Sequence, residues 1–75
     1  MNIDKMKKVF DNFLEEYKKI EMGYISSNKI NKNSVNKLKS MCKDMIDKRI
    51  IAAHNFDFSS DKEFLESVKK FVNTF

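Results

Sequence analysis

The 75-residue chain contains one cysteine, one glycine, one histidine and one arginine, and it has no proline or tryptophan. Cys42 has no second thiol to pair with, and Cys42 and His54 together cannot supply the four ligands of a structural zinc site. The longest apolar run, Ile50 to Ala53, is four residues, whereas a membrane helix needs about 20. These absences exclude an internal disulfide, leave a zinc site short of ligands, and predict no transmembrane segment.

Residue patterns that carry enzyme chemistry are also lacking. Glycine-rich phosphate loops, HExxH, CxxC and EF-hand patterns do not occur. On one helix, Cys42 and His54 would lie about 120° and ~18 Å apart, which is too far for a nucleophile and its base. The acidic pairs Glu15–Glu16 and Asp44–Asp47 lie among lysines, without the burial that raises a carboxyl pKa. We therefore expect no enzyme activity and no cofactor.

Composition also indicates where the protein acts. Charged residues interrupt the apolar ones from Asp4 onward, which argues against a signal peptide. A single unpaired cysteine fits a reducing compartment, so we expect a soluble, cytoplasmic protein. Abundant Lys, Asn and Ile are typical of an AT-rich genome, such as that of a low-GC bacterium or its phage.

The first 24 residues show a heptad pattern. Apolar residues recur in alternating steps of three and four at Ile3, Met6, Phe10, Phe13, Tyr17, Ile20 and Tyr24. This spacing predicts a helix over about residues 3–22, ended by Gly23 in a left-handed conformation. Residues 24–33 are then a linker, which Ile25 and Ile30 are expected to hold against the core.

A second helix is predicted over about residues 34–53, capped by Asn33 or Ser34, although a start at Ser27 stays open. Its apolar face comprises Val35, Leu38, Met41, Cys42, Met45, Ile46 and Ala53. Cys42 is therefore interpreted as a buried structural thiol.

The third helix is predicted over about residues 60–73, because Ser60 and Glu63 form a capping-box pattern. Its apolar stripe is Phe64, Leu65, Val68, Phe71, Val72 and Phe75. Phe56 and Phe58, in the preceding connector, are expected to cover an open end of the core.

Together these segments predict one all-α domain over residues 1–75, a small antiparallel three-helix bundle. The first helix is longer than the third, so its apolar seam is expected to extend past the local core. Two interpretations stay open: a core within one chain, and a homodimer through the first helix that completes the bundle.

The net charge of +4 is concentrated in the middle of the chain. Residues 24–54 carry seven cations against two carboxylates, a net charge of +5. Lys32, Lys39 and Lys43 share one stripe of the second helix and could contact phosphates, although a solvated lysine surface is favoured. Sequence-specific DNA-binding proteins commonly use arginine to hydrogen-bond guanine bases, and this chain has a single arginine. The pattern of the second and third helices also does not support a helix-turn-helix.

Arg49 falls on the apolar face of the second helix. It either extends outward to cap carbonyls or meets a carboxylate of another chain. Candidate partner-binding residues are therefore Lys32, Lys39, Lys43 and Arg49.

We expect a non-enzymatic helical module that binds another protein and regulates or inhibits it. Nucleic-acid binding through the second helix is one alternative. A peripheral protein of the bacteriocin-immunity type is another, because the chain is similar to such small helical proteins in size and composition alone.

Overall fold

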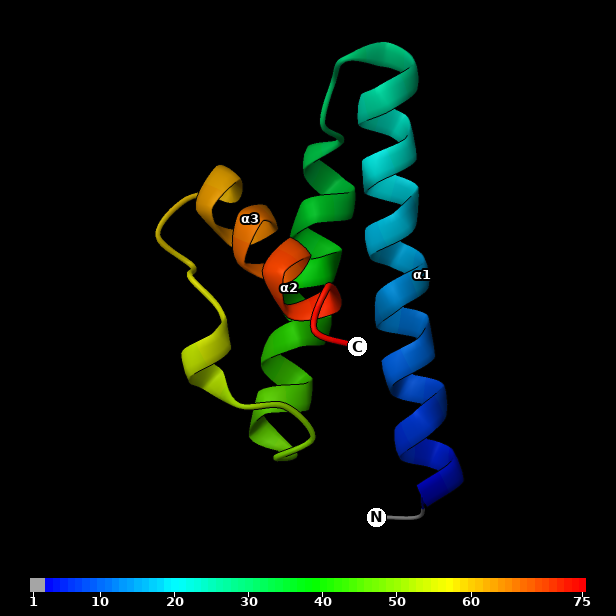
Figure 1. The fold of residues 1–75 in the computed structure, drawn as a ribbon, viewed down its shortest axis with the longest axis vertical. Coiled ribbons are helices and arrows are strands. Elements are labelled where there is room, and N and C mark those ends of the chain that lie inside the picture. The colour runs from blue at the N-terminus through cyan, green and yellow to red at the C-terminus, as the bar shows by residue number, and fades with distance from the viewer. Residues whose placement is uncertain (1–2) are drawn as a thin grey trace.

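The computed structural model describes residues 3–75, and these form three α-helices and no strand. The helices are α1 (Ile3–Ser27), α2 (Lys32–Asp47) and α3 (Asp61–Val72), with a short 3-10 turn, η1, at Ala53–Asn55. Helices α1 and α2 run antiparallel side by side, and α3 lies obliquely against them (Figure 1). The all-α, three-helix prediction is confirmed.

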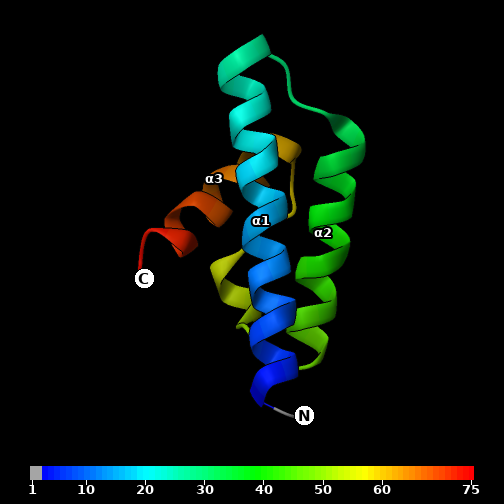
Figure 2. The ribbon, with the colours of Figure 1, turned by 90° about the vertical axis from the view of Figure 1, so that its right-hand side faces the viewer.

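The length of α1 sets the length of the molecule. Its 25 residues span about 38 Å at 1.5 Å per residue, and the chain's longest extent is 38 Å. Helix α2 has only 16 residues and α3 only 12. Both ends of α1 therefore project beyond α3 (Figure 2).

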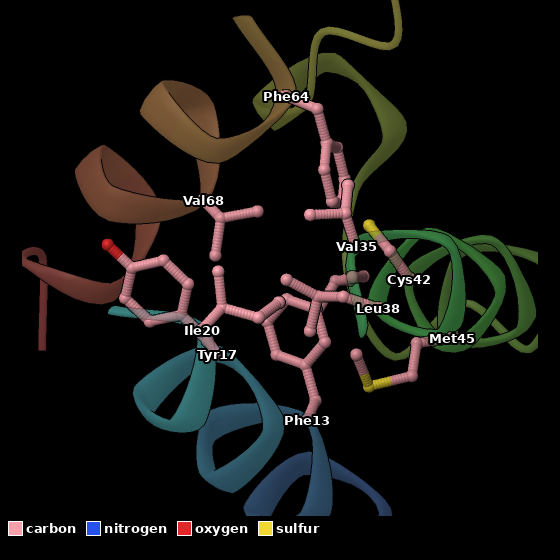
Figure 3. Packing of buried hydrophobic residues seen from close by; sticks show 10 residues of the cluster. Phe13, Tyr17, Ile20, Val35, Leu38, Cys42, Met45, Phe64 and Val68 are labelled. Carbon is pink, nitrogen blue, oxygen red and sulfur yellow. The ribbon is translucent and has the colours of Figure 1, made fainter. Parts of the chain in front are cut away.

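The core lies where the three helices meet, and the side chains that fill it come from every helix (Figure 3). Its buried apolar residues are Phe13, Tyr17, Ile20, Val35, Leu38, Cys42, Met45, Ile51, Phe64 and Val68. All except Ile51 belong to the apolar stripes expected from the sequence. Burial of each large side chain stabilises the fold by about 1.5–3 kcal/mol.

The heptad stripe of α1 is longer than the core that it serves. Phe13, Tyr17 and Ile20 are buried, but Ile3 is 80% exposed and Tyr24 is 49% exposed. Ile25 and Ile30 are also exposed, so the prediction that they hold the linker against the core was wrong. They lie on the part of the α1–α2 hairpin that extends past the buried cluster.

Helix α1 continues through Gly23 to Ser27, five residues beyond the predicted end at residue 22. The next residue, Asn28, has φ 56°, and its N–H donates to the Tyr24 carbonyl over 2.7 Å. Asparagine tolerates this left-handed conformation, so it ends the helix in place of glycine. Gly23 has no positive φ and stands inside the helix, where its carbonyl accepts the Ser27 hydroxyl over 2.6 Å.

Because α1 is longer, the linker is shorter and α2 begins at Lys32. The N-cap is Asn31, rather than Asn33, Ser34 or Ser27. Its Oδ1 accepts the backbone N–H groups of Asn33 and Ser34 over 3.0 and 3.2 Å.

Helix α2 ends at Asp47, which corrects the predicted end at residue 53. Arg49 has φ 59°, and its N–H donates to Ile46, while the N–H of Ile50 donates to Met45. These two bonds form a Schellman motif with arginine at the position that glycine usually occupies. Arg49 is thus exposed at a turn, and the prediction that it lies on the helix's apolar face was wrong.

The turn also changes which residues are buried after α2. Ile51 packs in the core, whereas Ala53, predicted to lie on the apolar face, is exposed. Reversal of the chain at Arg49 brings Ile51 inward, which a continuing helix would not do.

The connector closes the core as expected from its two phenylalanines. The Phe56 ring lies 6.4 Å from that of Phe13 and 5.0 Å from that of Phe71. Phe58 stacks on Phe64 at 5.2 Å. Helix α3 then begins as predicted, since the Ser60 hydroxyl accepts the Glu63 N–H over 3.1 Å.

Replacement of Gly23 by alanine is expected to stabilise the protein by about 0.5–1 kcal/mol, because glycine costs that much inside a helix. A Cβ at this position meets no atom within 4 Å, so no clash offsets the gain. Urea denaturation followed by circular dichroism measures it. A loss of stability in Gly23→Ala would contradict the helical assignment of residues 23–27.

Arg49→Gly is expected to raise the free energy of unfolding by about 0.5–1 kcal/mol, because glycine adopts a positive φ without the Cβ penalty. Lys48→Gly is the matched control. Lys48 has φ −83° and ψ 0°, so glycine there relieves no strain and should destabilise the protein. Equal effects of the two substitutions in thermal denaturation would argue against the Schellman motif.

Candidate functional site

The lysine stripe of α2 faces the start of α3. The Nζ atoms of Lys32 and Lys39 lie 2.6 Å from the two carboxylate oxygens of Asp61, the first residue of α3. Both ammonium groups hydrogen-bond to the carboxylate, with Lys32 the larger influence, and they hold the pKa of Asp61 below its usual range. This double ion pair fastens the first turn of α3 to α2.

Lys43, the third member of the stripe, lies over an aromatic ring of the connector. Its Nζ is 5.2 Å from the Phe58 ring centroid, and the Nζ of Lys39 is 6.0 Å from that of Phe64. Such cation–π contacts contribute about 0.5–1 kcal/mol at exposed sites. The stripe therefore has contacts within the fold.

The structure thus brings together Lys32, Lys39 and Lys43 but not Arg49, which lies beyond the end of α2. Whether any of the four binds a partner stays a prediction. The sequence signal for Asp61 was its place directly after the cap Ser60, which showed that it begins a helix but not that it faces α2.

The other side of α2 is also paired. Lys37 lies 3.6 Å from Glu16, which is 8% exposed and is the one buried charged side chain within residues 3–75. Lys48 pairs with Asp44 over 2.9 Å along the same helix. Much of the positive charge in the middle of the chain therefore faces carboxylates of this protein.

Cys42 and His54 lie in different environments, one buried and the other exposed. Cys42 is fully buried, and burial raises its pKa to about 12, so its thiol stays protonated at neutral pH. His54 is exposed in η1. Residues 3–75 contain no group of three side chains suited to hold a metal ion.

A groove lies between α1 and α3, and we call it the α1–α3 groove. It consists of two hollows of about 440 and 460 Å³ that share Tyr17, Glu21 and Lys69. The first hollow is lined by Tyr17, Ile20, Glu21, Tyr24, Ile30, Lys62, Leu65, Glu66 and Lys69. The second is lined by Phe10, Leu14, Tyr17, Lys18, Glu21, Lys69, Val72, Asn73 and Phe75. The groove thus follows α1 from Phe10 to Tyr24.

Tyr17 forms the middle of the groove. Its ring is packed in the core, and its hydroxyl points away from the core (Figure 3). The hydroxyl donates to Glu21 Oε2 over 3.1 Å. Burial, assisted by this carboxylate, raises the pKa of Tyr17 to about 12, so the phenol is a hydrogen-bond donor at neutral pH.

Exposed apolar side chains also lie near one end of the groove. Met22 is 69% exposed and Ile25 is 77% exposed, and they lie on the same hairpin as Tyr24 and Ile30. We call these four residues the hairpin tip. Clustered exposed apolar side chains are typical of interaction sites, whereas single ones are ordinary.

Sequence reasoning missed the groove and the hairpin tip as a site, although it expected the seam of the first helix to extend past the core. At 100° per residue, Met22 and Ile25 both lie about 90° or more from the heptad line, on the same side of it. An end at Gly23 would have removed Ile25 from the helix altogether. The helical spacing of Met22 and Ile25 was the signal that could have revealed them.

No family model, curated protein or solved structure matches this chain. None of the helices within residues 3–75 combines the length and the apolar character required to span a membrane.

The Asp61 ion pairs predict a pH dependence of stability. The folded-state pKa of Asp61 is lowered, so its contribution is complete above the unfolded pKa of about 4 and is lost as the pH falls through the folded pKa. Asp61→Asn should therefore be less stable than the wild type at pH 7. The difference should shrink below about pH 4.

Urea denaturation of both proteins across this pH range measures the effect. Asp47→Asn, at the last residue of α2, is the control, because it removes a carboxylate that makes no ion pair within residues 3–75. A constant difference between the wild type and Asp61→Asn down to acid pH would contradict the double ion pair.

Proposed function

We propose that this protein is a non-enzymatic interaction module that binds another cytoplasmic protein and regulates or inhibits it. The observation that supports the proposal is the continuity of the hairpin tip with the α1–α3 groove, because Tyr24 and Ile30 belong to both. Together they provide an elongated surface of apolar and charged side chains that no part of residues 3–75 covers.

The shape and chemistry of this surface fit an amphipathic helix. Apolar side chains from α1 and α3 line the groove, including Leu14, Ile20 and Leu65. Charged side chains of both signs line it as well, namely Lys18, Glu21, Lys62, Glu66 and Lys69. A helix laid in a groove places its apolar face inward and its charged flanks against such a rim.

Nucleic-acid binding by α2 is the weaker candidate. Two of the three stripe lysines already neutralise Asp61, which reduces the positive field available to a phosphate backbone. A peripheral role on anionic lipid would use the same lysines and has the same weakness. Neither alternative involves the hairpin tip, so neither accounts for the exposure of its four apolar side chains.

The proposal predicts that Ile25→Glu weakens capture of the partner. A charge at this exposed position leaves the core intact, but it would have to be buried against the partner's apolar face. Affinity capture from the source cells, with quantitative mass spectrometry, compares the wild type with the variant. A loss of at least about tenfold is expected for the specific partner.

Asn12→Glu is the matched control, because it adds the same charge to α1 at an exposed position outside the groove. The partner should stay bound to this variant. If the wild type and Ile25→Glu retain the same proteins, the hairpin tip is not the binding surface. Binding that instead fails in Lys43→Glu and falls steeply with salt would support the α2 alternative.

A further inference from the structure

We propose that the α1–α3 groove binds α1 of a second copy of this chain, in an antiparallel symmetric pair centred on Leu14. The inference rests on the groove used in the proposed function, and it names an occupant for that groove. Three features of α1 support it: its two exposed ends, the register that joins them, and the charges that this register brings together.

Each end of α1 carries an exposed isoleucine. Ile3 is 80% exposed at the start of the helix and Ile25 is 77% exposed near its end. Helix α3 covers only the middle of α1, and both ends project beyond it (Figure 2). At 100° per residue, Ile3, Leu14 and Ile25 lie within about 40° of one another, on the side of α1 that lines the groove.

An antiparallel pair makes these two ends meet. If Leu14 packs on Leu14 of the second copy, each earlier residue lies opposite one equally far beyond Leu14. Ile3 then faces Ile25 of the second copy, and Met6 lies level with Met22 of the second copy. Two-fold symmetry repeats each contact, so the exposed isoleucines at the two ends of α1 gain a partner.

The same register pairs opposite charges. Lys7, which makes no ion pair within residues 3–75, comes opposite Glu21 of the second copy, and symmetry produces this pair twice. Asp11 comes to lie beside Lys18 of the second copy. A parallel arrangement in register would instead place Lys7 against Lys7 and Glu21 against Glu21. Charge therefore favours the antiparallel pair.

The α1 stripe extends over about three heptads, which is the shortest length at which coiled-coil pairing is ordinarily sustained. Helix α3 widens the contact, because Lys69 and Val72 also line the groove. Helix α1 of the second copy thus contacts both α1 and α3, and the α1 and α3 helices of the two copies form a four-helix arrangement.

Sedimentation equilibrium of the purified protein, from ~1 µM to ~1 mM, tests the proposal. The wild type should dimerise in this range. Lys7→Glu and Glu21→Lys should each weaken dimerisation by about tenfold or more, because each places like charges together twice. The double variant, with both changes in one chain, should recover the wild-type affinity.

Mixing the two single variants should produce a heterodimer as stable as the wild-type dimer. Both charge pairs across that interface then join a carboxylate of one chain to an ammonium group of the other. Lys8→Glu and Glu15→Lys are the controls, because these residues lie on the other side of α1 and should have little effect. Circular dichroism of each variant checks that the helices are retained.

A chain that stays monomeric at every concentration would overturn the proposal. So would a dimer in which the double variant is no tighter than the single ones, since that result excludes the register. If the chain is monomeric but captures another protein through Ile25, self-pairing is overturned and the proposed function is supported. A dimer that captures nothing leaves self-pairing intact and overturns the proposed function.

Discussion

The attachment of α3 to α2 is the constraint on which the shape of this protein depends. Asp61, at the first residue of α3, bonds to Lys32 and Lys39 of α2, and the stacked rings of Phe58 and Phe64 hold the same end in place. With 12 residues, α3 is too short to cover both α2 and the whole of α1. The groove lies where α3 meets the middle of α1, and the hairpin tip lies beyond the part of α1 that α3 covers.

A chain of this size buries a limited fraction of its surface, so the apolar residues that it leaves exposed are informative. Met22 and Ile25 are exposed although polar side chains at the same positions would leave the core unchanged. The fully buried set, from Phe13 to Val68, is complete without them. Their presence therefore has no explanation in the stability of the isolated chain, but a protein partner would give them one.

Periodicity was sufficient to predict three helices and most of the core, because Phe13, Leu38, Phe64 and their neighbours follow the 3.6-residue repeat. Helix ends were predicted poorly, since they depend on which residues accept a positive φ. Gly23 was the natural candidate, yet Asn28 and Arg49 adopt that conformation instead. Ionic contacts between helices could not be read from the sequence, because the orientation of α3 determines that Asp61 meets Lys32 and Lys39.

Binding and folding are coupled in a domain with so small a core. Globular domains are stable by only about 5–15 kcal/mol, and an occupant present at 100 times its Kd adds about 2.7 kcal/mol to the folded state. For this chain that gain is a substantial part of the total, because a 75-residue protein lies at the low end of the range. An occupant of the α1–α3 groove would cover the exposed ends of α1 and also oppose separation of α3 from α1. The exposed ends of α1 therefore limit burial in the isolated chain. The same ends make the stability of the fold depend on a partner.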